Sequence, residues 1–316
     1  MKKNIAIFGA SGKIGTVVTQ ALLEQGHAVT ALQHSRPVPD GCRIVEGSVS
    51  DDDTVREVIG ENEIVLQLAT TKGDRAHFLD VAVGGTFQIL DAIRERGGCE
   101  QFVFAGGDCA VGIWYYRHLK PLTEEAPLRA YPGYYPLSKV LEETLVQQHH
   151  FQYGIPFTVL RMGWVHSPAS LLKTFLAGNI AGQVWRNMFR AEMSPELRAR
   201  AEGEGDGFVM VAVDQQGGTP IRRTSVSYND VAQAWLLAIG NPLARNEIFN
   251  LVHPAWDYAQ VGAFLAGKLG VPAERVPLDA HSWDMDTTKI RTVLGWKPED
   301  DVFGMLDVAV EELAGR

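Results

Sequence analysis

The segment YPGYYPLSKVLEE, residues 131–143, holds a tyrosine and a lysine at a spacing that suits acid–base chemistry. Tyr135 and Lys139 are four residues apart, so on a helix they lie on one face, one turn apart. Pro136 is typical of a first helical turn, where its missing N–H costs nothing. An ammonium beside a phenol lowers the phenol pKa from about 10, so that the pair can exchange a proton near neutral pH. The alternative is an exposed tyrosine and a solvated lysine, because this spacing often arises by chance.

A glycine-rich turn near the start of the chain has the spacing of a dinucleotide-binding loop. In IAIFGASGKIG, Gly9, Gly12 and Gly15 follow an apolar run and open a helical pattern. The first glycine permits a tight turn, the second lets the backbone approach a pyrophosphate, and the third allows close helix–strand packing. The helix N-terminus then offers free N–H groups to the phosphates. We expect dinucleotide binding rather than a glycine-rich turn without a ligand. The same loop contributes Ser11, Lys13 and Ile14.

The end of the second predicted strand indicates which dinucleotide binds. NAD is favoured by an acid at this point, because the acid holds the ribose hydroxyls. Here the strand ends ALQHSRP, with His34 and Arg36 and no acid, and Lys13 lies in the glycine loop. Basic groups suit a ribose 2′-phosphate, so we expect NADP, with NAD as the alternative. Arg36 as a solvent-facing loop charge is the competing interpretation.

The elements that must position these residues alternate along the first half of the chain. Short apolar runs predict strands, and the segments between them predict helices, among them 14–26, 74–96 and one from the quoted segment to about Tyr153. Continuously apolar, β-branched strands indicate a parallel sheet covered on both faces. The predicted fold class is α/β, a Rossmann-like doubly wound parallel sheet with a smaller C-terminal lobe. Gly84-Gly85 inside one predicted helix indicates close packing against a neighbour.

The pattern changes after Gly163. FVMVAV (208–213) and TPIRRTSV (219–226) are expected to be strands joined by a DQQGG turn, and EIFNLV (247–252) is expected to return to the main sheet. The smaller lobe is therefore interleaved with the last elements of the sheet. We predict a dinucleotide-binding domain of residues 1–165, completed by about 222–253, and a substrate-binding lobe of residues 166–221 and 254–316.

Composition excludes several classes of protein. The chain has 316 residues, 46% of them hydrophobic, and a net charge of −9, which argues against a general nucleic-acid binder. Cys42, Cys99 and Cys109 form no zinc or disulfide pattern, which fits a reducing cytoplasm and no metal site. The first apolar run, Ile5 to Phe8, is too short for a signal peptide, and no stretch approaches the roughly 18 apolar residues of a membrane span. We expect a cytoplasmic protein that acts on a small molecule and binds neither nucleic acid nor membrane.

Together these motifs resemble the extended short-chain dehydrogenase/reductase family, which includes NAD(P)-dependent sugar epimerases and dehydratases. The resemblance implies that Tyr135 exchanges a proton with a substrate hydroxyl or carbonyl while hydride passes to or from nicotinamide. It implies that Lys139 binds the nicotinamide ribose and lowers the tyrosine pKa, that Ala69 and Thr70 contact the cofactor, and that the protein is a homodimer. The resemblance runs nearly end to end, through QLAT (67–70), VGGTFQILDA (83–92), QFVFAGG (101–107), YYPLSKVLEE (134–143), FTVLRMGWV (157–165), SYNDVAQA (227–234), IFNLV (248–252) and LGWKP (294–298).

The chain departs from the family pattern at three positions. The hydroxyl residue that normally contacts the substrate oxygen falls on Gly106 or Gly107, the usual asparagine on Ala82, and the acid that often meets adenine on Ser48. A missing donor of this kind costs about 10² to 10³ in rate. Substitutes for the missing hydroxyl are Asp108, which is adjacent, and Thr70, Thr71 and Cys109. Asp108 would orient a substrate hydroxyl, or it would merely cap a turn.

Other residues are candidates for substrate contact. The aromatic segment GIWYYRHLK, residues 112–120, forms either a wall of the substrate pocket or the underside of a loop. Related proteins use an arginine near Arg222 to hold the phosphate of a nucleotide sugar, and a solvated pair with Arg223 is the alternative. We expect substrate contacts from Gly107, Asp108, Tyr134, His166 and Arg222.

The resulting hypothesis is an NAD(P)-dependent oxidoreductase or epimerase that acts on a hydroxyl or carbonyl group of a small polar, sugar-like substrate. Tyr135 is the expected acid/base and Lys139 tunes it. Two alternatives remain. One is a non-catalytic dinucleotide sensor of the same fold, which Gly107 and Ala82 favour and the intact Tyr135–Lys139 pair opposes. The other is a dehydratase or epimerase that keeps its cofactor bound and shows no net redox change.

Overall fold

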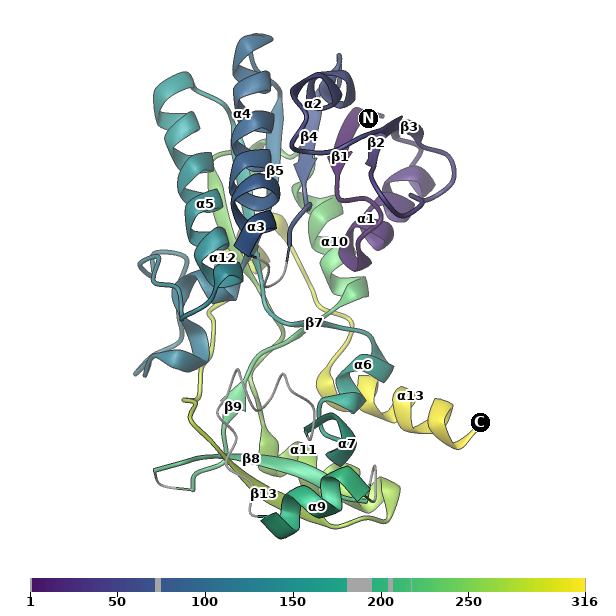
Figure 1. Ribbon diagram of the computed structural model, residues 1–316, viewed down its shortest axis with the longest axis vertical. Helices are drawn as coiled ribbons and strands as arrows, with labels where there is room; N and C mark the ends of the chain where they lie inside the picture. Colours follow the sequence, from purple (N-terminus) through teal and green to yellow (C-terminus); the bar gives the residue numbers. More distant parts are fainter. Residues whose placement is uncertain (1, 72–74, 181–194, 204–206, 217, 316) are drawn as a thin grey trace.

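The structure, a computed structural model, describes residues 2–71, 75–180, 195–203, 207–216 and 218–315. A larger lobe contains the main sheet, and a smaller lobe packs beyond one end of its strands (Figure 1). No helix in the described part of the chain is long and apolar enough to cross a membrane.

The larger lobe is built on a parallel sheet of seven described strands. Their order across the sheet is β11-β6-β5-β4-β1-β2-β3, and each neighbouring pair is parallel. This confirms the predicted doubly wound sheet, including the return of EIFNLV as an edge strand next to β6. The strands are β1 Asn4–Phe8, β2 Ala28–Gln33, β3 Arg43–Glu46, β4 Ile64–Gln67, β5 Gln101–Gly107, β6 Phe157–Met162 and β11 Glu247–Leu251.

Helices cover both faces of this sheet because alternate strand residues point to opposite sides. Ile5 and Ile7 of β1 pack into one apolar cluster with helices α1, α10 and α12, whereas Ala6 and Phe8 pack into another with α2, α4 and α5. The helices are α1 Lys13–Glu24, α10 Tyr228–Ala238 and α12 Thr288–Leu294 on the first face, and α2 Asp52–Ile59, α4 Gly85–Glu95 and α5 Tyr134–Tyr153 on the second. The predicted span of the helix that carries Tyr135 is confirmed.

The helix expected at 74–96 is not uniform. It consists of α3 Arg75–His77, a π-helical turn η1 Phe78–Gly84, and α4. A Cβ added to Gly85 would lie 2.9 Å from two methyl carbons of Val49, so the expected close packing at the glycine pair is confirmed. Glycine here lets α4 approach the segment after β3.

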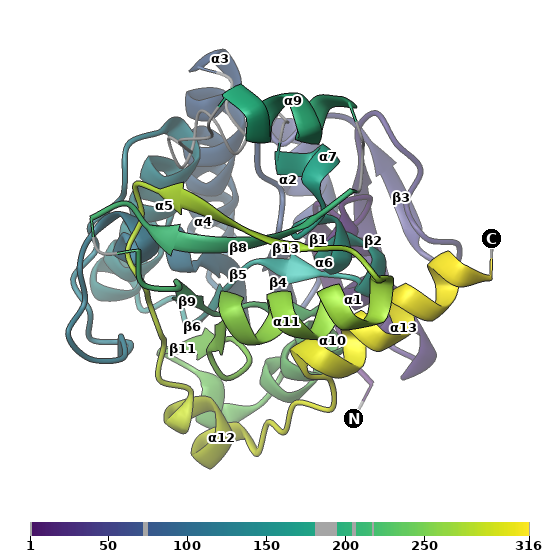
Figure 2. The ribbon, with the colours of Figure 1, turned by 90° about the horizontal axis from the view of Figure 1, so that it is seen from below.

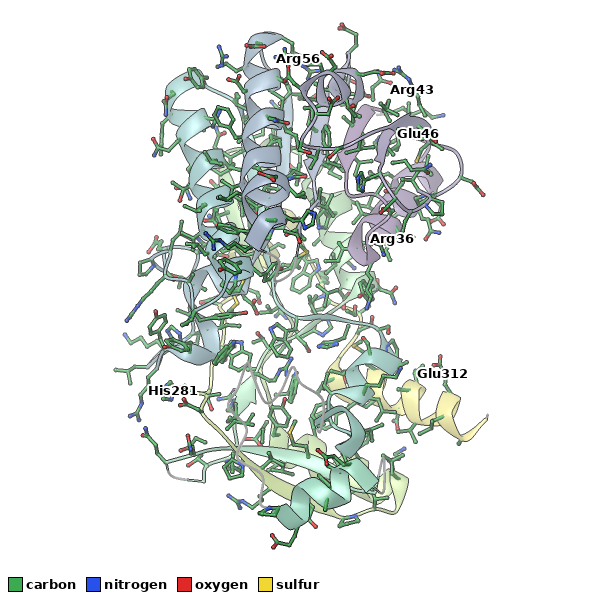
Figure 3. The ribbon with its side chains drawn as sticks, viewed as in Figure 1. Arg36, Arg43, Glu46, Arg56, His281 and Glu312 are labelled. Carbon is green, nitrogen blue, oxygen red and sulfur yellow. The ribbon has the colours of Figure 1, made fainter. Side chains whose placement is uncertain are left out.

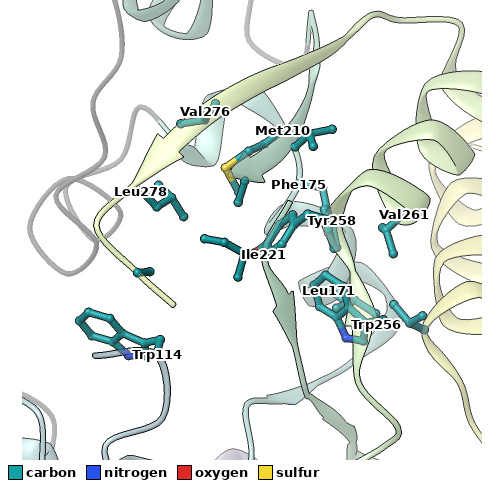
Figure 4. Packing of buried hydrophobic residues seen from close by; sticks show 14 of the residues in the cluster. Trp114, Leu171, Phe175, Met210, Ile221, Trp256, Tyr258, Val261, Val276 and Leu278 are labelled. Carbon is teal, nitrogen blue, oxygen red and sulfur yellow. The ribbon is translucent and has the colours of Figure 1, made fainter. Parts of the chain in front are cut away.

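The smaller lobe contains a two-stranded sheet with helices packed around it (Figure 2). β8 pairs in parallel with β13, and their apolar side chains pack on α11 and α6; Figure 4 shows Phe175, Trp256 and Tyr258 together in this core. The elements of this lobe are β8 Val209–Asp214, β13 Ala273–Leu278, α6 Pro168–Lys173, α7 Ala177–Ile180, α9 Pro195–Gly203, α11 Tyr258–Leu269 and α13 Val302–Ala314.

The expected hairpin of residues 208–213 and 219–226 forms only next to its turn. The N–H of Asp214 donates to the Thr219 oxygen at 2.8 Å and the N–H of Ile221 donates to the Ala212 oxygen at 3.0 Å, on either side of the Val213–Pro220 bridge. The rest of the expected second strand does not pair with β8. Two short strands follow instead, β9 Arg222–Arg223, which pairs with β12 Trp256–Asp257, and β10 Val226–Ser227, which pairs with β7 Val165–His166. Short 3₁₀ turns complete the structure at η2 Asp108–Val111, η3 Ile113–Tyr115 and η4 Pro242–Ala244.

The division between the lobes differs from the expected one near the C-terminus. The sequence places residues 254–316 in the smaller lobe, whereas Ile290, Leu294 and Trp296 belong to the apolar cluster beneath the main sheet. The indole N–H of Trp296 donates to the backbone oxygen of Asp230 at 3.0 Å. The chain therefore returns to the sheet once more before α13. The other domain boundaries stay predictions.

Candidate active site

The glycine loop joins β1 to α1 at the end of the sheet that faces the smaller lobe (Figure 1). Gly9 has φ +94°, and a Cβ there would lie 2.6 Å from the backbone nitrogen of Ala69. A Cβ on Gly15 would lie 2.0 Å from the backbone oxygen of Gly9. Only glycine fits at either position. Gly12 is the N-cap of α1 and gives no side-chain cap, so the first N–H groups of the helix are available to an anion.

The remaining residues of the loop lie around this helix end. Lys13 is exposed at the first position of α1, Ser11 and Ile14 are partly buried, and the first turn of the helix contains no acid. A phosphate at this end would therefore meet no carboxylate from α1. The uncapped N-terminus and the narrow glycine cradle fit a pyrophosphate.

Two adjoining loops border the same end of the sheet. His34 and Arg36 follow β2 and are exposed. Figure 3 shows Arg36 at the end of the larger lobe that faces the smaller lobe, with Arg56 at the opposite end. Ala69 is partly buried and Thr70 is exposed after β4, and the tight approach of Gly9 to Ala69 brings the β4 loop against the glycine loop. The structure thus brings the predicted cofactor residues to one edge of the sheet.

Tyr135 and Lys139 lie on the first turns of α5, one turn apart. The Lys139 ammonium is 6.0 Å from the centre of the Tyr135 ring and 4.8 Å from that of Phe104. Its nitrogen is 3.1 Å from Oε2 of Glu142, and both side chains are buried. The lysine therefore faces the phenol but has a carboxylate as its ion-pair partner.

The effect of the surroundings on the phenol is the reverse of the expected one. Burial raises the pKa of Tyr135 well above its usual range, and the neighbouring Cys109, Asp108, Tyr131 and Glu142 raise it further. The spacing of Tyr135 and Lys139 in the sequence predicts that Lys139 lowers this pKa. That expectation was wrong because it omitted desolvation and the acidic groups that tertiary packing brings to the ring.

The missing hydroxyl residue falls at Gly107, the last residue of β5. A Cβ on Gly107 would lie 3.9 Å from the Tyr135 hydroxyl, 3.8 Å from Cγ of Lys139 and 3.1 Å from the sulfur of Cys109. Of the two positions left open, Gly107 therefore faces the phenol, whereas a Cβ on Gly106 would meet Val159 at 2.7 Å. The strand end beside Tyr135 carries no hydroxyl of its own.

Asp108 is the neighbouring acid, in the 3₁₀ turn η2. It is 4% exposed, and its Oδ2 accepts no hydrogen bond from any residue that the structure describes. Burial raises the pKa of Asp108 to about 7, although Arg223 opposes the rise. A Cβ on Gly163 would lie 3.6 Å from Oδ2, so the carboxyl group lies over the end of β6. At neutral pH it exists in both protonation states and can accept or donate a hydrogen bond.

The structure separates the two arginines of β9. Arg222, the predicted substrate residue, has a side chain that is 56% exposed and lies 3.9 Å from a carboxylate oxygen of Asp284. Arg223 is 1% exposed. Successive residues of a strand point to opposite sides, so only one of the pair turns inward. The arginine that turns inward is Arg223, and substrate contact by Arg222 stays a prediction.

Arg223 is a buried cation enclosed by aromatic rings. Its guanidinium carbon is 3.9 Å from the ring centre of Trp164, 5.2 Å from that of Trp256 and 5.7 Å from that of Trp283. One nitrogen, Nη1, donates to the Tyr258 hydroxyl at 3.0 Å. Nε and Nη2 donate to no group within the described ranges. Such a cation, close to Asp108, has donors left for an anionic ligand.

Two other predicted substrate residues are Tyr134, which precedes Tyr135 on α5, and His166 of β7. Tyr134 is 43% exposed, and its ring packs against Phe78 of η1 at 5.6 Å. His166 is 9% exposed in β7, with Nδ1 3.4 Å from the Ser170 hydroxyl. The aromatic segment 112–120 is divided: Trp114 is buried in the core of the smaller lobe, whereas Tyr115 is 38% exposed.

Sequence reasoning missed two residues of this site. One is Arg223, whose signal is the strand alternation of TPIRRTSV, since alternation turns one of the two adjacent arginines inward. The other is Glu142, whose spacing of three residues from Lys139 on a helix indicates contact.

The doubly wound sheet, the glycine loop after β1 and the Tyr135–Lys139 pair on α5 together are typical of a class of dinucleotide-binding enzymes. The chain belongs to the NAD dependent epimerase/dehydratase family, whose family model matches residues 5–251. It is therefore an enzyme of the extended short-chain dehydrogenase/reductase superfamily, as the sequence resemblance implied.

Known relatives and structures agree with this assignment. The chain is 23% identical to a UDP-glucose 4-epimerase from Lactobacillus helveticus, over 94% of this chain and 92% of that protein. It is 26% identical to a UDP-N-acetyl-alpha-D-glucosaminuronate decarboxylase from Bacillus cytotoxicus, over 65% and 66% of the two chains. A short-chain dehydrogenase/reductase superfamily protein from Agrobacterium tumefaciens, solved with bound NAD, is similar with a TM-score of 0.86 and 26% identity, covering 99% of this chain and 98% of that one.

Proposed function

We propose that this enzyme interconverts a hydroxyl and a carbonyl group of a small, anionic, sugar-like substrate, with Tyr135 as the acid/base. The observation that supports this most is the place of the Tyr135 hydroxyl beside Gly107 at the end of β5, with Lys139 on the same helix. A bound nicotinamide would supply the hydride acceptor or donor for this step. The glycine loop, Ala69 and Thr70 would hold the dinucleotide.

The protein side chains divide the remaining tasks. Tyr135, whose pKa is raised, is a protonated phenol in the resting protein and is suited to donate its proton to a carbonyl oxygen. In the oxidative direction the phenol must first lose this proton to solvent, and the phenolate oxygen then takes the proton of the substrate hydroxyl. Asp108 would orient a neighbouring hydroxyl in place of the missing serine, since its unpaired oxygen lies at the same strand end.

Arg223 supports an anionic substrate group. Its Nε and Nη2 donors are buried, and a phosphate or carboxylate would pair with them in a low-dielectric environment. The relatives named for UDP-sugar reactions suggest a nucleotide sugar as one substrate class, and a free sugar acid as another. His166, Tyr134 and Gly107 are proposed to line the rest of the substrate site.

The test of this function is Tyr135→Phe, with Tyr153→Phe as the matched control, because Tyr153 is 52% exposed at the other end of α5. Turnover should fall by at least about 10²-fold in Tyr135→Phe, because a general acid/base contributes this much. Dinucleotide binding, measured by fluorescence titration, should be kept in both variants, and Tyr153→Phe should retain turnover. Undiminished turnover in Tyr135→Phe, with any substrate identified from a panel of sugars, sugar acids and nucleotide sugars, refutes the proposal.

For the cofactor, we propose a preference for NADP, with NAD as the alternative that the NAD-bound similar structure favours. The support for NADP is the exposed Arg36 after β2 and the absence of an acid in ALQHSRP. If Arg36 binds a 2′-phosphate, Arg36→Ala should weaken NADP binding by about tenfold, or 1.4 kcal/mol, and leave NAD binding unchanged. Equal losses for both dinucleotides would show that Arg36 does not read the 2′-phosphate, and tighter binding of NAD than of NADP by the unaltered protein would assign NAD.

A dinucleotide sensor is the second candidate, and Gly107 and Ala82 favour it because two polar groups of the family pattern are absent. Tight cofactor binding without turnover across the substrate panel would establish it. Cofactor retained through purification, with product formed and no net redox change, would instead indicate an epimerase or dehydratase.

We also propose a homodimer formed by residues 73–96 and 133–153. The outer side chains of these helices support it, because Phe87, Leu137, Phe151 and Tyr153 are 41–72% exposed. Light scattering of the purified protein tests this, and a monomeric mass at micromolar concentration contradicts it.

A further inference from the structure

Glu142 is a buried carboxylate whose contacts connect it to the proposed catalytic pair. It lies on α5, three residues after Lys139, and is 0% exposed. Its Oε2 is 3.1 Å from the Lys139 nitrogen. Burying a carboxylate costs free energy, because the charged group loses its hydration. The nearby Lys139 ammonium and a hydrogen bond offset that cost for Glu142.

The second oxygen of Glu142 begins a buried hydrogen-bonded chain. Thr86 of α4 donates its hydroxyl to Oε1 at 3.1 Å, and Gln67 donates its amide to the Thr86 oxygen at 2.9 Å. Gln67 also receives a hydrogen bond from the backbone N–H of Ala69 at 3.1 Å. The chain therefore runs from Lys139 to the β4 loop, which contacts the glycine loop.

We propose that Glu142 is a positioning residue that fixes the Lys139 ammonium in place and offsets its positive charge. Lys139 is then held beside Tyr135 without acting on the phenol as an uncompensated cation. The inference rests on the proposed function, in which Tyr135 is the acid/base. Ala82, in η1 against α5, supplies no polar side chain where the resemblance expects an asparagine, so Glu142 is the polar partner that this chain provides on the lysine side.

Several groups around Tyr135 disfavour its phenolate, so the charge left on the Lys139 side affects the pKa of the phenol. Asp108 and Cys109 face Tyr135 from η2, Tyr131 faces it from the preceding loop, and Glu142 faces it from the same helix. Lys139 is the nearest cation on α5, and Arg223 lies beyond Asp108. Because Glu142 is 3.1 Å from the ammonium, the pair acts on the phenol as a dipole, whose field is much weaker than that of a single charge.

The neighbouring residue shows that a buried acid on α5 need not have this role. Glu143 receives two hydrogen bonds from Arg161, at 2.6 and 3.1 Å, and its pairing tethers α5 to β6. Glu142 has no arginine of this kind among the contacts described for it. Burial raises the pKa of Glu142, and Lys139 and Thr86 oppose that rise by favouring its ionised form.

The test is an alkaline titration of tyrosinate absorbance in the protein without substrate. The signal of Tyr135 is isolated as the difference between each protein and its Tyr135→Phe counterpart. In Glu142→Gln the ammonium loses its compensating charge, so the Tyr135 midpoint should fall by about 1 pH unit or more. A midpoint that is the same in the wild type and in Glu142→Gln overturns the proposal. The proposal is also overturned if Tyr135 titrates in neither protein before unfolding.

Thr86→Val is the matched control, because it removes a hydrogen bond to Glu142 and no charge. Its midpoint should equal that of the wild type, and a fall as large as in Glu142→Gln would assign the effect to loosened packing and overturn the proposal. If Glu142→Gln does not fold, the double variant Lys139→Met/Glu142→Leu removes both charges together. The Tyr135 midpoint of this double variant should match that of the wild type. A shift in either direction refutes the proposal that Glu142 offsets the charge of Lys139.

The measurement separates this inference from the proposed function. Full turnover in Tyr135→Phe defeats the proposed function, whatever the titration gives. Lost turnover in Tyr135→Phe together with an unchanged midpoint in Glu142→Gln defeats only the role of Glu142.

Discussion

Asp108→Asn should raise the free energy of unfolding, relative to the wild type, more at alkaline pH than at acidic pH. Asp108 is 4% exposed, and its pKa is raised from 3.8 to about 7 by burial. A carboxyl group with a raised pKa favours folding while it is protonated, and this contribution is lost as the pH rises from about 4 through 7. The asparagine amide has nearly the same shape and carries no charge at any of these pH values.

The size of the effect follows from the shift in pKa. At 1.36 kcal/mol per unit, the ionised side chain costs up to about 4 kcal/mol at pH 8. Between pH 5 and pH 8 the cost grows by about 2–3 kcal/mol, because part of it is already present at pH 5. The free energy of unfolding of Asp108→Asn, relative to the wild type, should rise by this amount over the same interval.

The assay is urea unfolding, followed by circular dichroism, at several pH values between 5 and 8.5. The comparison between pH values cancels any constant effect of the amide, such as an unpaired N–H group. Asp40→Asn, at an exposed position, is the control and should show no such trend. Parallel pH dependences for Asp108→Asn and the wild type would refute the reasoning that this carboxyl group is desolvated and unpaired.

Two further substitutions test the scaffold of the site. Gly15→Ala would place a Cβ 2.0 Å from the Gly9 oxygen, so we expect a loss of about 1–3 kcal/mol in thermal or urea unfolding and weaker dinucleotide binding. Gly267→Ala, which meets nothing within 4 Å, should be tolerated, and equal behaviour of the two would contradict the account of the loop. Glu143→Gln leaves the buried Arg161 without its charge partner and should destabilise by about 3 kcal/mol, whereas a loss below about 1 kcal/mol in urea unfolding would show that the pair contributes little.

Local patterns were sufficient for much of the fold. The glycine spacing, the apolar strands and the helix that begins at Tyr134 are short-range features, and each was predicted near its observed bounds. The hairpin at 208–226 forms only next to its turn: β8 pairs along its length with β13, more than fifty residues away, and Arg222–Arg223 pair with β12. Pairing at such a distance leaves no mark on the turn sequence.

The amino-acid sequence by itself determined the family, the doubly wound sheet and the positions of the loop and of the Tyr135–Lys139 pair, because these depend on residue types at fixed spacing. Only the tertiary structure decided the electrostatics of the pair. Burial and the acids from η2 and α5 raise the pKa of Tyr135, and strand alternation turns Arg223 inward and Arg222 outward. Desolvation and charge depend on which groups meet in space, and residues far apart in the chain are brought together only by folding.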